Sequence, residues 1–402
     1  MAALVAQSVL LADGLSAEEL VIYGDQRDPF GNFRSYTHAI QQDRMRSESS
    51  GHFFPSDFPG LALLESLRRR TPRPLLRSLI DRYQPQLDDL LAHGTAVANA
   101  LESARCFVPA RVGQVARIDE ETLALRDESG QCLGTAQHVI LALGHPGLRW
   151  PPCLSEWRDH PRVGHAYQPK EYHAGEVVLV VGRGMAAAHE WLAALRVGCR
   201  VAALSRLPVH HQPLNAPRCD FSASGLDRYR RLNPADRHAY LDHIAAGSYP
   251  WRSEWERELE HARSLGMLRL VQAEILSVAL ENERLTMRLS NGDFLWADRI
   301  TAATGFSPDA GAHRVISRLA ELDGVALEQG RLIIGDDFCV PPVSLYRSRL
   351  SVIGNLARWA LPVADTFAGM KYVARRLRPL WGIRADPLVR LRFQQRLAQQ
   401  RF

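Results

Sequence analysis

The stretch that most constrains the fold runs from residue 177 to residue 188 and reads VVLVVGRGMAAA. An apolar, β-branched run ends in Gly-x-Gly-x-x-Ala at Gly182, Gly184 and Ala187, and an alanine-rich segment that reads as a helix follows directly. The first glycine permits a tight turn, the second lets backbone approach a pyrophosphate, and the alanine lets the helix lie close to the strand. A helix N-terminus also attracts phosphate. The pattern therefore predicts a dinucleotide-binding strand–turn–helix unit, with an ordinary tight turn as the alternative.

The residues after the next strand indicate which dinucleotide is bound. A strand is expected over residues 200–204, and Ser205 and Arg206 follow it. Sites for NAD usually place an acidic residue there, because it accepts a hydrogen bond from the ribose 2′-hydroxyl. A hydroxyl and a guanidinium instead suit a 2′-phosphate, which a carboxylate would repel. We therefore expect NADPH to be preferred over NADH, unless Arg206 is only a solvated arginine at a strand end.

Length and composition restrict the class of protein. The chain has 402 residues, 46% hydrophobic and 23% charged, which is typical of a soluble globular protein of two or three domains. Its net charge of +5, without a lysine-rich run, favours anionic cofactors over nucleic acid. No apolar run approaches the roughly 20 residues that span a bilayer. Six scattered cysteines without a CxxC pair argue against a zinc or redox-dithiol site and predict a reducing, cytoplasmic location.

These limits predict a small-molecule substrate and no nucleic-acid or membrane partner, and they leave a homo-oligomer open. We expect no metal site. Two adjacent histidines, His210 and His211, lie in a polar helical insertion at residues 207–265. A packed or surface role is favoured for them, because no third ligand follows at a recognisable spacing.

The N-terminal residues are typical of the later part of a dinucleotide-binding unit. A helix is expected over residues 1–13 and a strand over 19–23, followed by Gly24 and Asp25. A complete unit begins with a strand and a GxGxxG turn, and an acidic residue after its second strand binds ribose. The chain therefore is expected to start inside such a unit, just after its phosphate loop. Asp25 then stands at the ribose-binding position, with a turn-forming aspartate as the alternative.

Three further parts of the chain carry a family resemblance. Residues 139–146, VILALGHP, resemble the strand and glycine that link the FAD and NADPH domains of two-dinucleotide flavoproteins. Residues 300–306, ITAATGF, resemble the returning link. Residues 350–355, together with 365–369, resemble the C-terminal strand and helix that cap the flavin. The order of these segments along the chain resembles that of the flavin-containing and N-hydroxylating monooxygenases, within the wider FAD/NAD(P)-binding oxidoreductases.

The resemblance implies an α/β fold with two Rossmann-like dinucleotide-binding domains, the NADPH domain inserted in the FAD domain and the first FAD-domain strand missing. The expected domains are residues 1–170 for the first part of the FAD domain, 171–300 for the NADPH domain, and 301–402 for the return and cap. FAD and NADPH are the implied cofactors. The cofactor-binding residues that the resemblance adds are Gly144, Thr304, Gly305, Gly354, Asn355 and Asp365.

The segment 44–57 runs near the isoalloxazine ring in relatives. Its candidates for catalysis are Arg46, Ser47 and His52, to which no individual roles are assigned. The alternative is a structured loop that holds the FAD domain together. Asn355 stands where many relatives have an aspartate near the ribityl chain, and an amide still hydrogen-bonds a hydroxyl.

The activity implied by the resemblance is that of a monooxygenase. NADPH reduces the flavin, which takes up O₂ as a C4a-(hydro)peroxide and oxygenates a small metabolite. One alternative is a flavoprotein reductase or dehydrogenase without oxygen transfer. A second is a non-catalytic scaffold of the same fold that binds FAD poorly, which the missing GxGxxG favours because that loop holds the FAD pyrophosphate. A start codon placed too late is the other explanation for its absence.

Overall fold

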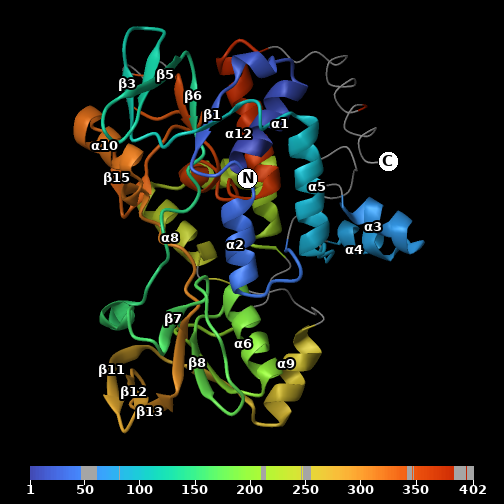
Figure 1. Cartoon of the computed structure of the whole chain (residues 1–402), viewed down its shortest axis with the longest axis vertical. Helices are drawn as coiled ribbons and strands as arrows, with labels where there is room; N and C mark the ends of the chain where they lie inside the picture. Colours follow the sequence, from blue (N-terminus) through green and yellow to red (C-terminus); the bar gives the residue numbers. More distant parts are fainter. Residues whose placement is uncertain are drawn as a thin grey trace.

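The computed structural model describes residues 1–46, 61–80, 82–209, 214–245, 247, 255–341, 346, 348–383 and 395. It has two α/β halves, one above the other along the longest axis in Figure 1. We call the half that contains helices α1 (Ala2–Ala12) and α12 (Phe367–Leu380) the terminal half, and the half that contains α6 (Met185–Val197) the central half. The predicted α/β class is confirmed.

The central half is built on a five-stranded parallel sheet in the order β10-β9-β8-β14-β7. A three-stranded antiparallel sheet, β11-β12-β13, covers one of its faces. The strands are β7 (Val163–His165), β8 (Val177–Val181), β9 (Arg200–Ser205), β10 (Leu268–Gln272), β11 (Ile275–Glu281), β12 (Arg284–Leu289), β13 (Phe294–Ala297) and β14 (Arg299–Ala302).

The middle strand β8 is buried on both faces, as its unbroken apolar sequence requires. Val178 and Val180 pack with residues of α6 and α9 (Trp255–Ser264). Leu179, on the opposite face, packs with Leu285 and Met287 of β12. The run that predicted a buried strand thus lies at the centre of the sheet.

The terminal half distributes its strands over several small sheets. Two of these are parallel pairs, β1 with β2 and β6 with β17, and a three-stranded antiparallel sheet β3-β4-β5 lies beside them. The strands are β1 (Ile22–Gly24), β2 (Phe107–Pro109), β3 (Gln114–Arg117), β4 (Leu123–Arg126), β5 (Cys132–Ala136), β6 (Val139–Leu141), β15 (Leu327–Glu328), β16 (Arg331–Leu332) and β17 (Leu350–Val352).

Helices supply a large part of the core of the terminal half. Helices α1 and α12 lie side by side, and α5 lies next to α1 in Figure 1. The remaining helices are α2 (Gly31–Ala39), α3 (Leu61–Arg69), α4 (Arg73–Leu79), α5 (Leu87–Ala100), α7 (Ala223–Arg230), α8 (Pro234–Ala245) and α10 (Arg314–Asp323).

Two local expectations change in the structure. The predicted strand over 19–23 shortens to β1, because a capping box at Ser16 and Glu19 winds residues 17–19 into a 3₁₀ turn. The predicted insertion at 207–265 divides between the halves. Tyr229 of α7 donates to the Trp359 carbonyl of the terminal half at 3.1 Å, whereas α9 packs on α6. The domain boundaries themselves stay a prediction. Strand β7 lies before residue 171, the predicted start of the NADPH domain, but it pairs with β14 in the central sheet.

Two linkers that pair with each other join the halves. The first follows β6 and the second follows β14. The Arg149 N–H donates to the Gly305 carbonyl at 2.9 Å, and the Ser307 N–H donates to the Gly147 carbonyl at 2.8 Å. These antiparallel contacts fix one linker against the other, so the strand ends of both halves meet at this seam.

Buried polar side chains of the central half fasten it to the seam and to α2. The His165 ring is fully buried, and its Nε2 lies 3.2 Å from the Arg149 carbonyl oxygen. Lys170 donates to the Ala39 carbonyl at 3.1 Å and lies 3.0 Å from the Glu190 carboxylate of α6. Burial lowers the pKa of His165 to about 4, because an imidazolium loses its hydration there. The ring is therefore neutral near pH 7.

This burial predicts a pH dependence of stability. Between the ordinary His165 pKa of 6.5 and its folded-state value of about 4, the unfolded chain binds a proton that the folded chain excludes. The free energy of unfolding therefore falls as the pH drops through this window. We expect His165→Asn to flatten the dependence, as measured by urea unfolding at a series of pH values. His38→Asn, at an exposed position on α2, is the control and should keep the wild-type slope; an unchanged slope in His165→Asn would contradict the assignment.

Glycines follow the two neighbouring strands β8 and β14, and they are required for different reasons. Gly182 has φ 145°, and a Cβ there would lie 2.4 Å from the Ala303 carbonyl oxygen. Gly305 has φ 77°, and a Cβ there would meet nothing within 4 Å. Backbone conformation and space both demand glycine at the first position, whereas only conformation demands it at the second.

The two glycines therefore predict unequal costs. Gly305→Ala should lower the free energy of unfolding by about 1–2 kcal/mol, the cost of a Cβ in left-handed backbone. Gly182→Ala should lower it by about 3 kcal/mol or more, because a backbone clash adds to the strain. Chemical denaturation of both variants is the measurement. Equal losses would show that the close contact with Ala303 is relieved without cost.

Candidate functional site

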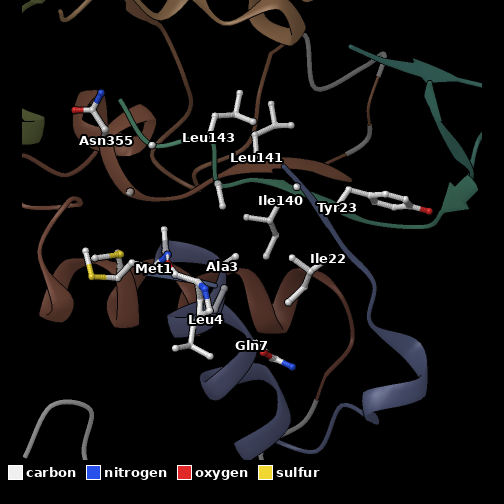
Figure 2. A pocket seen from close by; sticks show the side chains of 18 of the residues that line it. Met1, Ala3, Leu4, Gln7, Ile22, Tyr23, Ile140, Leu141, Leu143 and Asn355 are labelled. Atoms are coloured by element: carbon white, nitrogen blue, oxygen red, sulfur yellow. Dashed lines mark hydrogen bonds between the residues drawn. The ribbon is translucent and has the colours of Figure 1, made fainter. Parts of the chain in front are cut away.

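A cavity of about 1690 Å³ opens in the terminal half and reaches the seam. Its walls are α1, β1, β6, the start of α12 and the linker residues that follow β6 and β14. Figure 2 shows Met1, together with Ala3 and Leu4 of α1, with Ile22 of β1 beside them and Ile140 of β6 above. The lining is mainly apolar in this region, and polar groups gather where strands end.

Six predicted site residues line this cavity, and they come from segments far apart in the sequence. They are Asp25, Arg46, Gly144, Gly354, Asn355 and Asp365. Asp25 directly follows β1, and its carboxylate lies 3.6 Å from Arg111 at a well-exposed position. Such a carboxylate has lone pairs left to accept hydrogen bonds from hydroxyl groups. Asp365 precedes α12 and lies 3.9 Å from Arg358.

Two glycines at strand ends bring bare backbone to the cavity wall. Gly144 follows β6 with φ 74°, and Gly354 follows β17 with φ 72°. A Cβ on Gly354 would lie 3.4 Å from the Ala2 Cβ at the start of α1. Glycine at these positions allows the left-handed turn and leaves the peptide groups accessible. Both predicted positions therefore lie where a ligand can approach the main chain.

Arg46 reaches the cavity with a partner that sequence reasoning did not find. Its side chain is buried, and its Nε donates to the Asn215 Oδ1 at 2.7 Å. Desolvation lowers the pKa of Arg46 to about 9. The guanidinium remains charged at neutral pH, so it gives the cavity an anion-attracting group. Asn215 lies 169 residues away along the chain, and no local pattern marks it. Ser47 and His52 lie outside the described residues.

An aromatic stack at the seam forms part of the cavity wall. The His145 and Phe306 rings are stacked at 4.2 Å, and the Phe306 and Tyr167 rings at 4.6 Å. The Tyr36 ring meets Tyr167 and Phe306 edge-on, at 5.4 and 5.0 Å. All four residues line the cavity. Such rings offer a flat apolar surface for another planar ring.

His145 and Phe306 directly follow Gly144 and Gly305, the two linker glycines, so their positions carry a local signal in the sequence. Burial lowers the pKa of His145 to about 4, and the Asp365 carboxylate opposes this in part. The imidazole is therefore uncharged at neutral pH. The aromatic stack thus gives the cavity a neutral surface, while the Asp365 carboxylate and the buried Arg46 guanidinium give it charged groups.

A second group of predicted residues lies at the turn between β8 and α6. Gly184 is the N-cap of α6, and no side chain caps the first N–H groups of that helix. Ala187 is fully buried one turn into the helix, where it allows close packing. Met185 opens the helix, and Gly182 follows β8. An uncapped helix N-terminus at the end of a parallel strand is a suitable site for a phosphate.

Arginine side chains flank this turn. Arg206 follows β9 and lies 3.7 Å from Glu274, both being exposed. Desolvation is the larger cause that lowers the pKa of Arg183, and the positive charge of Arg206 is the smaller one. The two cations therefore lie near each other. Ser205 donates to the Leu207 carbonyl at 2.6 Å. Thr304, predicted as a cofactor residue, donates its hydroxyl hydrogen to the Arg149 carbonyl at the seam.

The described part of the chain has neither a metal-ligand cluster nor a membrane-crossing helix. No group of three or more histidine, cysteine, aspartate or glutamate side chains is placed there to hold a metal ion. His210 and His211 lie outside that part. No helix within it has both the length and the apolarity needed to cross a membrane.

The sequence matches no protein-family model and no curated protein. The fold, in contrast, is similar to solved structures over nearly the whole chain. An ornithine N-hydroxylase from Kutzneria sp. 744, solved with FADred, NADP⁺ and L-orn, is 13% identical, with 93% of this chain and 95% of that chain covered and a TM-score of 0.67.

Two further structures show how widely this fold is shared. A flavin-containing monooxygenase from Stenotrophomonas maltophilia is 17% identical, with 94% of each chain covered and a TM-score of 0.58. A bacillithiol disulfide reductase from Bacillus cereus is 15% identical, with 93% of this chain and 96% of that chain covered and a TM-score of 0.53. The chain therefore has the α/β fold of the flavin monooxygenases with two dinucleotide-binding domains, a fold that flavoprotein reductases share.

Proposed function

We propose that the protein is an FAD- and NADPH-dependent oxidoreductase, and specifically a monooxygenase that oxygenates a small metabolite. The observation that carries the proposal is one continuous cavity from Asp25 to the aromatic stack at the seam. Its volume of about 1690 Å³ exceeds the roughly 300–1,000 Å³ of pockets that hold one drug-sized ligand. It therefore has room for a flavin dinucleotide and a substrate.

The residues around the cavity fit a flavin dinucleotide at several points. Asp25 would bind a ribose, the backbone at Gly144 and Gly354 would approach the cofactor, and Asn355 and Asp365 would bind hydroxyl groups. FAD bound there would accept a hydride from NADPH and pass electrons to O₂, which is chemistry that the side chains alone cannot perform. The Kutzneria enzyme, solved with FADred and NADP⁺, supports this choice of cofactors.

The side chains of the cavity wall would control water and charge. The stacked rings of His145, Phe306 and Tyr167 present a neutral surface that excludes water from a reacting group. His145 is uncharged near pH 7, so it does not donate a proton as an imidazolium. Arg46, held by Asn215, would bind an anionic group of the substrate or cofactor.

NADPH would occupy the turn between β8 and α6. The α6 N-terminus would bind the pyrophosphate, and Arg206 and Ser205 would bind the 2′-phosphate after Arg206 leaves Glu274. Domains bounded at residues 170 and 300 are part of the same proposal. A cytoplasmic location is proposed on cysteine usage alone.

A flavoprotein reductase without oxygen transfer is the second candidate, because a bacillithiol disulfide reductase shares the fold. Dithiol chemistry is disfavoured, since none of the cysteines borders the cavity as described. A non-catalytic scaffold of this fold is the third candidate.

One experiment separates the three candidates. The purified chain is mixed with FAD, freed of unbound flavin and examined by visible spectroscopy; NADPH oxidation, O₂ uptake and peroxide release are then recorded. We expect retained flavin and O₂-dependent oxidation of NADPH. Oxidation of NADPH without O₂ uptake, when an artificial acceptor is supplied, would instead indicate a reductase. No retained flavin and no oxidation of NADPH would indicate a scaffold.

The nucleotide preference is tested at Arg206. We expect Arg206→Ala to weaken NADPH binding by about 1–3 kcal/mol through loss of a charge-assisted contact, with NADH binding little changed. Dissociation constants for both nucleotides, measured by fluorescence quenching, give the comparison. Arg200→Ala, at the exposed opposite end of β9, is the matched control and should bind NADPH like the wild type. Equal losses for NADPH and NADH in Arg206→Ala would refute the 2′-phosphate assignment.

A further inference from the structure

Helices α3 and α4 form a helical hairpin that stands out from the side of the terminal half, beyond α5, in Figure 1. The hairpin and the residues just after it are strongly basic. Residues 61–82 contain six arginines and only two acidic residues, Glu65 and Asp81. No described residue of this stretch lines the cavity, so binding of a cofactor there does not account for its charge.

Two of the arginines hold the hairpin in place. Arg68 donates two hydrogen bonds to the Asp89 carboxylate of α5, at 2.6 and 2.7 Å. Arg69 lies 2.9 Å from the buried Glu65 carboxylate, which also accepts a hydrogen bond from the Tyr83 hydroxyl. These contacts fix the orientation of the hairpin on the terminal half, and they leave the remaining arginines without these carboxylates as partners.

The outer face of α4 carries exposed aliphatic side chains. Leu76 and Leu79 are each 57% exposed, and Ile80, directly after the helix, is 54% exposed. Residues three or four apart lie on the same face of a helix, so Leu79 and Ile80 both adjoin Leu76. Pro74 and Ser78, on the opposite face, are buried. A single exposed leucine is ordinary, whereas adjoining ones form an apolar patch.

Arginines border these aliphatic side chains. Arg73 precedes Leu76 by three residues, and Arg77 precedes Ile80 by three, so both arginines lie beside the apolar residues on the helix surface. Both are exposed, and neither forms an ion pair within residues 61–80, 82 or the other described ranges. We call Arg73, Leu76, Arg77, Leu79 and Ile80 the α4 patch. It presents an apolar surface with a cationic border.

We propose that the α4 patch binds the surface of a membrane that contains anionic lipids. The arginines lie at the level of the lipid phosphates, and the aliphatic side chains enter the boundary of the acyl chains, as in amphipathic helices that lie in the plane of a bilayer. The sequence expectation of no membrane partner rests on the absence of a spanning run, which surface binding does not need. The inference does not depend on the proposed activity.

A lipid surface fits the α4 patch better than a protein surface does. A stable protein interface buries about 800 Å² on each partner. Helix α4 has only seven residues and is about 10 Å long, which is small for such an interface. A bilayer needs no complementary shape. It also supplies negative charge beside an apolar interior, which is complementary to cations beside aliphatic side chains.

A second copy of the chain fits less well. A two-fold contact places the same patch on both sides of the interface. It would therefore bring Arg73 and Arg77 of both copies into one contact, and such a meeting of like charges is unfavourable.

The test measures binding of the full chain to lipid vesicles. Co-sedimentation with vesicles of phosphatidylcholine, and with vesicles that also contain phosphatidylglycerol, gives dissociation constants at low and high salt. Two double variants change the patch: Leu76→Gln/Leu79→Gln and Arg73→Gln/Arg77→Gln. Two matched controls make the same changes at exposed positions of the rest of the chain: Leu265→Gln/Leu322→Gln and Arg263→Gln/Arg269→Gln. Thermal midpoints of all the variants show that they are folded.

We expect binding to the vesicles that contain phosphatidylglycerol, and much weaker binding to phosphatidylcholine alone. The arginine patch variant should bind about tenfold or more weakly, because each arginine near an anionic surface contributes about fivefold. The leucine patch variant should also lose about tenfold or more, through the lost burial of apolar surface. Both controls should bind like the wild type, and high salt should weaken binding.

Several results would overturn the proposal. The first is no binding of the wild type to anionic vesicles. The second is an equal loss in patch variants and controls, which would indicate attraction of the overall positive charge. Unchanged binding of the leucine patch variant would show that no apolar side chain enters the lipid. Self-association of the wild type without vesicle binding, lost in the patch variants, would assign the patch to a second copy. Retention on immobilised polyglutamate without vesicle binding would favour an acidic protein. None of these measurements uses activity, so failure of the proposed function leaves them interpretable.

Discussion

The structure depends on the pairing of main-chain groups in parallel strands. In the central half, β8 pairs on both edges, and its apolar side chains hold α6 on one face and β12 on the other. Without β8, the strands β9 and β10 would form one pair and β14 and β7 another, with no strand between the pairs. The terminal half has this arrangement, with α1 and α12 rather than a continuous sheet as the support between its pairs. The large cavity follows from the gap between those pairs.

Both candidate sites lie where parallel strands end, because a sheet gathers the ends of its strands at one edge. Asp25, Gly144 and Gly354 follow β1, β6 and β17, whereas Gly182 and Arg206 follow β8 and β9. Residues distant in sequence therefore meet without any local signal beyond a strand and a glycine. The paired linkers at residues 147–149 and 305–307 then hold the two edges against each other. The seam is thus a consequence of sheet geometry and not of a separate interface.

Much of the fold was predictable because its signals are local. The run before Gly182, the two linker glycines, and the C-terminal strand and helix expected at residues 350–355 and 365–369 all depend on neighbours in sequence, and each appears in the structure. The partnership of Arg46 with Asn215 was not predictable, since 169 residues separate them and neither type is distinctive. The division of the helical insertion was missed for a similar reason. The contact of Tyr229 with the Trp359 carbonyl does not change the pattern of apolar residues along the sequence, so the pattern does not reveal it.

Charge is distributed along the two sites in a way that suits long anionic cofactors. Cations stand at the outer ends, with Arg206 beside the turn after β8 and Arg111 beside Asp25. The aromatic stack between them is uncharged, because burial keeps the His145 ring neutral and the other stacked rings are Phe306 and Tyr167. Phosphates are stabilised where water screens their charge and arginine is available, whereas planar rings are stabilised by stacking where water is excluded. If FAD and NADPH bind as proposed, with their phosphates beside Arg111 and Arg206, the stacked rings at the seam offer a neutral surface for the uncharged ring of each cofactor.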